Sequence, residues 1–213
     1  MNQKTLIFLH GFLSSAQGTK VQFLRQKLTS EVNVAFHTIE FNPTPRDFEF
    51  MTVTGQINRV RQYMLDQRLE AVSLIGSSLG GLVALHYAYR YGGVTRLLLL
   101  APALGYDPGR TPAAELKAWE ASGRRRLWHD AFQAELPLHY DYHLDRLRFN
   151  PPPPPPVETV IIHGLNDEVV PIDGSRQYAA AYPERVRLLE VDSDHRLSDQ
   201  LDLMWREVRS ALI

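Results

Sequence analysis

Six short apolar segments, separated by stretches with helical spacing, constrain the fold of this chain more than any other feature. They show little alternation between apolar and polar positions, which is typical of strands buried on both faces of a parallel sheet. One of them, 95–101, contains four consecutive leucines, but it is short and bounded by Gly and Pro, which favours a strand. The six predicted strands are 5–9, 32–39, 71–75, 95–101, 157–163 and 186–191.

Helical stretches follow most of these segments, and Gly92-Gly93 ends one of them. Repeated alternation of strand and helix implies parallel pairing with right-handed crossovers, and therefore helices on both faces of the sheet. We predict an α/β fold with a mostly parallel sheet of about six strands. The predicted helices are 18–29, 53–69, 79–91, 175–181 and 197–212.

Residues 103–156 interrupt this alternation between the fourth and fifth strands. A helix is predicted over 112–132, so the segment is interpreted as a helical, lid-like insert. It ends in six prolines, 151–156, which in polyproline II geometry span roughly 18 Å as a stiff strap. The strap is interpreted as a connector back into the sheet rather than as a ligand for a proline-recognising module. Residues 41–51, which contain Pro43 and Pro45, predict a loop.

Composition excludes several classes of site. The 213 residues suit a single domain over 1–213, and the absence of cysteine excludes disulfides, thiolate nucleophiles and cysteine-ligated zinc. A formal net charge of -1 gives no general attraction to nucleic acid or to an anionic membrane. No apolar run reaches the length of about 18 residues that a membrane span needs, and none near the N-terminus resembles a signal peptide. We therefore predict a cytoplasmic protein with neither nucleic-acid nor membrane partners.

Cofactor and metal motifs receive no support either. Neither G-x-G-x-x-G nor G-x-x-x-x-G-K-[ST] occurs, so no nucleotide cofactor is predicted. His139 and His143 have the spacing of one helical face, but the nearby Glu of a zinc-protease pattern is missing. The prediction is that the chain needs no cofactor and no metal.

The segment Gly76-Ser77-Ser78-Leu79-Gly80 stands between a predicted buried strand and a predicted helix. This G-x-S-x-G pattern in that context is typical of a nucleophile elbow, a sharp turn that exposes a serine at the carboxyl edge of the sheet. The two glycines fit positions where a Cβ would collide with neighbouring backbone. Ser78 is the candidate nucleophile, and Ser77 should point away. The alternative is an ordinary turn in which Ser77 or Ser78 caps the helix.

With these motifs, the chain resembles the α/β-hydrolase superfamily over almost its full length. More narrowly, the chain is similar to small single-domain bacterial serine esterases, with His-Gly-Phe-x-Ser-Ser at 10–15 and Gly-Ser-Ser-Leu-Gly-Gly at 76–81. The resemblance implies a Ser-His-Asp triad in which the acid and the base each follow a strand. The helical insert and the proline strap depart from that group.

Asp167 and His195 occupy the positions that the resemblance implies for acid and base. Asp167 follows the fifth strand within an H-G-x-x-D-x-V-x-P motif, and His195 follows the sixth within D-H. Such a base would activate the serine, and the carboxylate would orient the base. Some α/β-hydrolases carry the acid after the fourth strand, so Asp107 remains an alternative. Other nearby carboxylates are Glu168, Asp192 and Asp194.

The resemblance also implies an oxyanion hole built from two backbone amides. One donor would be Leu79, the residue after the nucleophile, and the other would be Phe12 in the loop after the first strand. The Phe12 ring would then line the substrate pocket. Several aromatic residues of the insert are expected to pack it onto the domain, and Trp128 is a candidate for the substrate cleft.

Together these features predict a serine hydrolase that cleaves a small-molecule carboxylic ester through an acyl-enzyme. A thioesterase or a carbon–carbon bond hydrolase would use the same triad, and a cofactor-free haloperoxidase-like activity is also compatible. A non-catalytic binding protein on a hydrolase fold is the alternative of another class. Acyl length and oligomeric state do not follow from the sequence.

Overall fold

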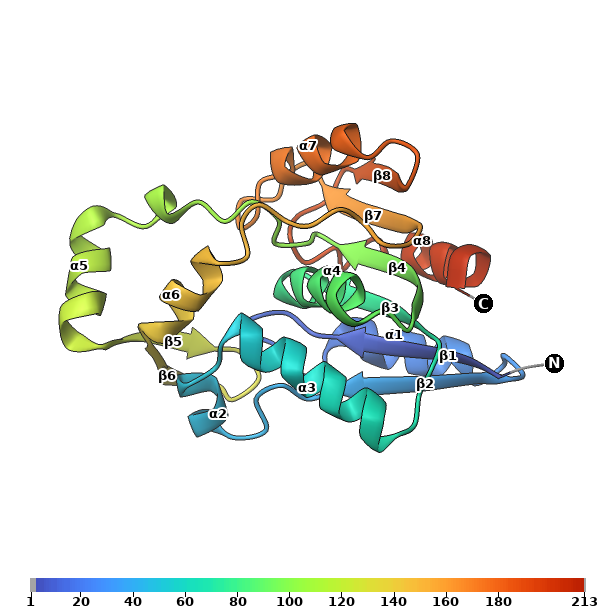
Figure 1. Cartoon of the computed structure of the whole chain (residues 1–213), viewed down its shortest axis with the longest axis horizontal. Helices are drawn as coiled ribbons and strands as arrows, with labels where there is room; N and C mark the ends of the chain where they lie inside the picture. Colours follow the sequence, from blue (N-terminus) through green and yellow to red (C-terminus); the bar gives the residue numbers. More distant parts are fainter. Residues whose placement is uncertain (1–2, 213) are drawn as a thin grey trace.

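A six-stranded parallel sheet forms the centre of the computed structural model, which describes residues 3–212 (Figure 1). The strand order is β2-β1-β3-β4-β7-β8, and every neighbouring pair runs parallel, as predicted. The strands are β1 (Lys4–Leu9), β2 (Val34–Ile39), β3 (Val72–Ser77), β4 (Val94–Leu100), β7 (Thr159–Gly164) and β8 (Val186–Val191).

Helices cover both faces of this sheet, which explains why the strands are continuously apolar. In β1, Ile7 and Leu9 pack in the same cluster as α3 and α4, whereas Leu6 and Phe8 pack in the cluster of α1 and α8. Both side-chain directions of the strand are therefore buried. The helices are α1 (Thr19–Leu28), α3 (Val53–Asp66), α4 (Leu79–Tyr91), α7 (Asp173–Ala181) and α8 (Leu201–Glu207), the last followed by a wider helical turn over Val208–Leu212. None of the helices in the described part of the chain is both long and apolar enough to cross a membrane.

The predicted loop over 41–51 contains a short helix, α2 (Pro45–Glu49), so that prediction is wrong. The Thr44 side chain accepts a hydrogen bond from the Asp47 amide, and the Asp47 carboxylate accepts one from the Thr44 amide. This capping box, with a proline in the first turn, satisfies the amides at the start of a helix. The prolines mark a helix start here rather than an irregular segment.

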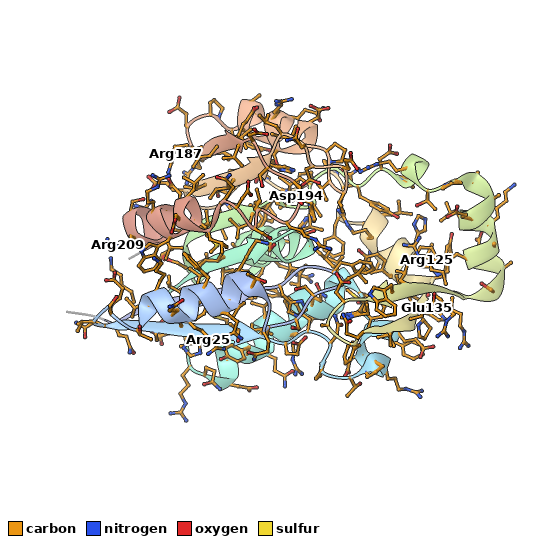
Figure 2. All side chains as sticks on the ribbon, turned by 180° about the vertical axis from the view of Figure 1, so that it is seen from behind. Arg25, Arg125, Glu135, Arg187, Asp194 and Arg209 are labelled. Atoms are coloured by element: carbon orange, nitrogen blue, oxygen red, sulfur yellow. The ribbon has the colours of Figure 1, made fainter. Side chains whose placement is uncertain are left out.

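The insert between β4 and β7 is not the single helix predicted over 112–132. Helix α5 (Ala113–Ser122) ends at Gly123, whose φ of 72° is the left-handed conformation that glycine adopts readily. An antiparallel hairpin follows, made of β5 (Arg124–His129) and β6 (Ala134–His139), and then α6 (Asp141–Leu147). Seen from behind, Arg125 and Glu135 of this hairpin lie at the opposite end of the molecule from Arg209 (Figure 2). The insert thus projects from the strand ends as helix, hairpin and helix.

Hydrogen bonds attach the C-terminal part of the insert to the sheet layers. Asp145 of α6 accepts bonds from the amide and the hydroxyl of Thr54, at the start of α3. In the proline strap, the Pro153 carbonyl accepts a bond of 2.8 Å from the Tyr178 hydroxyl of α7, and Pro155 is buried. The strap therefore packs on the sheet layers, as the connector interpretation requires.

Candidate active site

Ser78 occupies a strained turn between β3 and α4. Its backbone has φ 54° and ψ −117°, a conformation that residues with a Cβ rarely adopt. A Cβ added to Gly76 would lie 2.5 Å from the Gly80 carbonyl oxygen, and one added to Gly80 would lie 2.6 Å from the His10 carbonyl oxygen. Both positions therefore exclude any larger residue. The side chain of Ser78 stands at the carboxyl edge of the sheet, beside the first turn of α4.

A chain of hydrogen bonds runs from Ser78 through His195 to Asp167. His195 Nε2 lies 3.0 Å from Ser78 Oγ, and His195 Nδ1 lies 2.7 Å from Asp167 Oδ2. A carboxylate oxygen can only accept, so Nδ1 carries the hydrogen and the neutral ring has a lone pair on Nε2. That lone pair is placed to accept the hydroxyl proton of Ser78. The three residues come from three separate strand ends.

The Asp167 carboxylate is held in its charged form by several donors. Its Oδ1 accepts bonds from the Val169 and Val170 amides, at 2.9 and 2.7 Å. Its Oδ2 also lies 3.1 Å from Nε2 of His163, a fully buried residue. Burial alone would raise the pKa of this carboxyl, but the hydrogen bonds from His163, His195 and Val170 outweigh it and hold the pKa well below its usual range.

The alternative acid, Asp107, has a different role. Its Oδ1 accepts a bond of 2.8 Å from the Gly109 amide and caps a short turn at the start of the insert. Among the neighbours of His195, Asp194 accepts from the Arg196 amide and supports the loop, and Asp192 accepts from the side chain of Asn166. Of the predicted candidates, the structure brings Asp167 to His195.

The two backbone amides predicted for the oxyanion hole donate no hydrogen bond to the described part of the chain. Within residues 3–212, neither Phe12 nor Leu79 donates a backbone hydrogen bond to another protein group. Leu79 is the first residue of α4, where helix geometry leaves the amide without an internal partner. The loop that carries Phe12 lies against the serine, because a Cβ on Gly11 would come 3.3 Å from the Ser78 Cβ. Both donors are therefore available beside the nucleophile.

A cavity of about 810 Å³ opens beside Ser78 and His195. Phe12 lines it, and its ring stacks on Tyr142 with 5.0 Å between centroids. Trp128 is not among the lining residues: it lies on the outer side of β5 and is half-exposed. The insert instead reaches the cavity through Asp130 and Ala131, at the tip of the hairpin. No sequence motif marked these two residues, because only the folded position of the hairpin brings them to the site.

The other histidines of interest have ordinary partners. His163 Nδ1 lies 2.8 Å from the Ser175 hydroxyl. Its contact with Asp167 was not predicted. His139 lies beside Asp141, and His143 Nδ1 is 2.9 Å from the Tyr106 hydroxyl. Among residues 3–212, no group of three or more His, Asp or Glu side chains is arranged to hold a metal ion.

Two of three comparisons with known proteins found a match. Residues 5–209 match the model of the Uncharacterised protein family (UPF0227). The curated proteins contain no match. Solved structures with the same fold include the alpha/beta hydrolase domain-containing protein 10 from mouse, which is 23% identical, with a TM-score of 0.76 and coverage of 96% of this chain and 88% of that one.

Two esterase structures are also similar. Est1E from Butyrivibrio proteoclasticus, solved with ferulic acid bound, is 18% identical, with a TM-score of 0.66 over 98% of this chain and 91% of that one. A structure from the work on carboxylesterases of Nitrososphaera gargenis is 14% identical, with a TM-score of 0.67 over 97% and 89% of the two chains. At these identities the likeness establishes the fold. The chain belongs to the family UPF0227, and its fold is that of the α/β-hydrolases.

Proposed function

We propose that this protein is a serine hydrolase that cleaves carboxylic esters through an acyl-enzyme. The observation that carries the proposal is the hydrogen-bonded series Ser78–His195–Asp167 on a strained turn, with two free amides beside it. A binding site alone has no need of a charged carboxylate behind a histidine that faces a serine hydroxyl. The esterases among the structural neighbours support the proposal by analogy of fold.

In the first half of the reaction, Ser78 Oγ attacks the carbonyl carbon of the ester while His195 Nε2 takes the hydroxyl proton. The electron pair of the carbonyl π bond moves to the oxygen, and the amides of Leu79 and Phe12 donate to this oxyanion. Loss of one such donor costs on the order of 3 kcal/mol of transition-state stabilisation. Asp167 remains ionised and stabilises the imidazolium, in keeping with its lowered pKa.

Collapse of the tetrahedral intermediate re-forms the carbonyl and breaks the bond to the alcohol oxygen, which takes the proton from His195. The acyl group is then bonded to Ser78 Oγ. A water molecule attacks the acyl carbon with His195 as general base, and a second collapse releases the carboxylic acid and returns the proton to Ser78. Every proton in this scheme passes through His195 Nε2.

Covalent labelling with a fluorophosphonate probe tests the nucleophile. We expect labelling of the wild type and none of Ser78→Ala, while Ser77→Ala keeps its labelling as the matched control. Labelling of a folded Ser78→Ala protein, or none of the wild type, would contradict the assignment. The second result would favour a binding protein.

A substrate panel tests the bond that is cleaved. p-Nitrophenyl esters of increasing acyl length are compared with acyl thioesters of the same length and with a β-diketone. We expect the highest kcat/KM for an oxygen ester. A preference of more than about tenfold for thioesters or for carbon–carbon cleavage would replace the esterase proposal and keep the triad.

A further inference from the structure

His10, the first residue after β1, donates a hydrogen bond into the oxyanion loop. The side chain is almost fully buried, and its Nδ1 lies 2.8 Å from the Gly11 carbonyl oxygen. A carbonyl oxygen only accepts, so Nδ1 carries the hydrogen. The same oxygen accepts a longer bond, of 3.4 Å, from the Ser14 amide. Two donors from the same loop thus hold the Gly11 carbonyl oxygen.

The Gly11 carbonyl and the Phe12 amide belong to one peptide unit. A trans peptide is planar, and its C=O and N–H point in opposite directions. A donor that fixes the Gly11 oxygen therefore also fixes the direction of the Phe12 N–H. Because Gly11 lies against Ser78, this direction decides whether the amide meets the oxyanion.

Glu40 connects His10 to the far end of the same loop. It directly follows β2, and the register Leu9↔Ile39 places it beside His10. Its Oε1 lies 2.9 Å from His10 Nε2, and its Oε2 accepts a bond of 2.9 Å from the Ala16 amide. One carboxylate therefore holds the loop at residue 10 and at residue 16, on both sides of Phe12.

The charge on Glu40 fits this role. Burial raises the pKa of its carboxyl, but hydrogen bonds from His10 and from the Ala16 and Asn42 amides outweigh that effect and lower the pKa to about 2. His10 Nε2 is thus close to two groups at the end of β2, the Glu40 carboxylate and the Phe41 amide nitrogen, the latter 3.1 Å away.

We propose that Glu40 is a positioning residue of the oxyanion hole, which acts through His10 and Ala16 to hold the Gly11–Phe12 peptide with its N–H toward the substrate oxygen. This inference rests on the proposed function. Glu40 does not line the cavity beside Ser78, whereas His10, Gly11 and Phe12 do. Its effect must therefore reach the reaction through the loop.

The test compares Glu40→Gln with the wild type in two measurements. Gln has one acceptor oxygen where Glu has two, so it cannot accept from both His10 and Ala16. One anchor of the loop is therefore lost. We expect kcat for a p-nitrophenyl ester to fall about tenfold with KM within about twofold, less than the loss expected on deleting an oxyanion donor. The matched control is Glu158→Gln, which breaks an ion pair with Arg96 at the amino ends of β4 and β7, away from the oxyanion loop, and should leave kcat unchanged.

The second measurement is the inhibition constant of an alkyl boronic acid, which forms a tetrahedral adduct with the serine and places an oxygen in the hole. We expect its affinity to weaken in Glu40→Gln by the same factor as kcat, while the affinity of the carboxylic acid product changes by less than about twofold. Equal boronate affinity in folded wild-type and variant proteins would overturn the proposal. A wild type that binds the boronate but cleaves no ester would overturn the esterase function alone.

His10→Asn provides a second route to the same answer, including the case in which Glu40→Gln does not fold. The Asn amide can still donate near the Nδ1 position but cannot reach Glu40, so the variant removes the connection alone. We expect the losses of kcat in the two variants not to multiply in the double variant, as for residues that act in series. A full kcat in His10→Asn, or losses that multiply, would show that Glu40 does not act through His10.

Discussion

The strand ends that carry Ser78, His195 and Asp167 differ from the outer part of the insert, α5 and the hairpin, in how tightly each side chain is held. At the strand ends, every polar group of the series has a named partner, and the Asp167 carboxylate alone has contacts with two histidines and two amides. In the insert, α5 is exposed apart from the partly buried Leu116 and the buried Trp119, whose indole N–H donates to the Leu138 carbonyl. The hairpin meets the cavity only at its tip.

This difference suits two separate tasks, the chemical step at the strand ends and the selection of a substrate at the hairpin tip. Chemistry at a serine requires donors and acceptors within a few tenths of an ångström, which rigid strand ends supply. Selection of a substrate requires a wall of suitable size and polarity, which a hairpin tip can supply with few fixed hydrogen bonds. We therefore expect substitutions at the strand ends to change kcat and substitutions at the tip to change substrate preference.

The largest effect is expected from Asp167, the proposed triad acid. Asp167→Asn should lower kcat by about 10⁴-fold, because a neutral amide favours the wrong tautomer of His195. The matched variant Asp107→Asn, at the start of the insert, should stay within about twofold. Both are measured as steady-state hydrolysis of one ester. A loss confined to Asp107→Asn would move the acid into the insert and remove the contrast between the two regions.

A smaller effect is expected at the hairpin tip. Ala131→Trp fills part of the cavity and should lower kcat/KM for long-chain esters by about tenfold while acetate esters change little. The matched variant Trp128→Ala, on the outer side of β5, should leave the profile of acyl lengths unchanged. The readout is kcat/KM across a series of p-nitrophenyl esters. A profile that responds to Trp128 and ignores Ala131 would contradict the lining described for the cavity.

The strap should affect stability without affecting catalysis. Tyr178→Phe removes the hydroxyl that donates to the Pro153 carbonyl and leaves that oxygen without this partner. We expect a loss of about 1 kcal/mol in the free energy of unfolding and an unchanged kcat. Tyr182→Phe is the control, since its hydroxyl makes no hydrogen bond within residues 3–212. Denaturant titration measures the difference, and equal losses in both variants would argue against the strap contact.

The smallest effect concerns acid stability. A carboxyl whose pKa is lowered by folding contributes stability that is present above its unfolded pKa, about 4.3 for Glu, and is lost as the pH falls toward the folded value. For Glu40 the folded pKa is about 2. The difference in Tm between wild type and Glu40→Gln should therefore narrow between pH 5 and pH 2. A constant difference over this range would mean that the charge of Glu40 contributes little to stability.

The sequence predicted the six strands and the fold class because parallel strands buried on both faces leave continuous apolar runs. Ser78, Asp167 and His195 could be proposed because each sits in a short motif tied to a strand end. The hairpin could not be read in this way. Its first strand begins with three charged residues, Arg124, Arg125 and Arg126. In a two-stranded hairpin with one buried face, the alternation of apolar and polar residues is too short to be distinguished from a helical pattern. Gly123 was the available signal, as a residue that ends helices.

Contacts between residues far apart in the chain could not be predicted from the sequence for a different reason. His10 and Glu40 are thirty positions apart, and they become partners only once the pairing of β1 with β2 is known. Asp130 and Ala131 reach the cavity because of the direction in which the hairpin folds back. Local patterns carry no information on either contact.

The place of β2 in the sheet has a consequence for how the protein would lose activity. It is an edge strand, most of its side chains are only partly buried, and Glu40 follows it directly. Edge strands open more readily than central ones, and amide hydrogen exchange reports such openings. A brief detachment of β2 would release the loop around Phe12 while Ser78, on the central strand β3, kept its geometry. While β2 is detached, Ser78 would still react with a strong electrophile, but the protein would no longer turn over an ester.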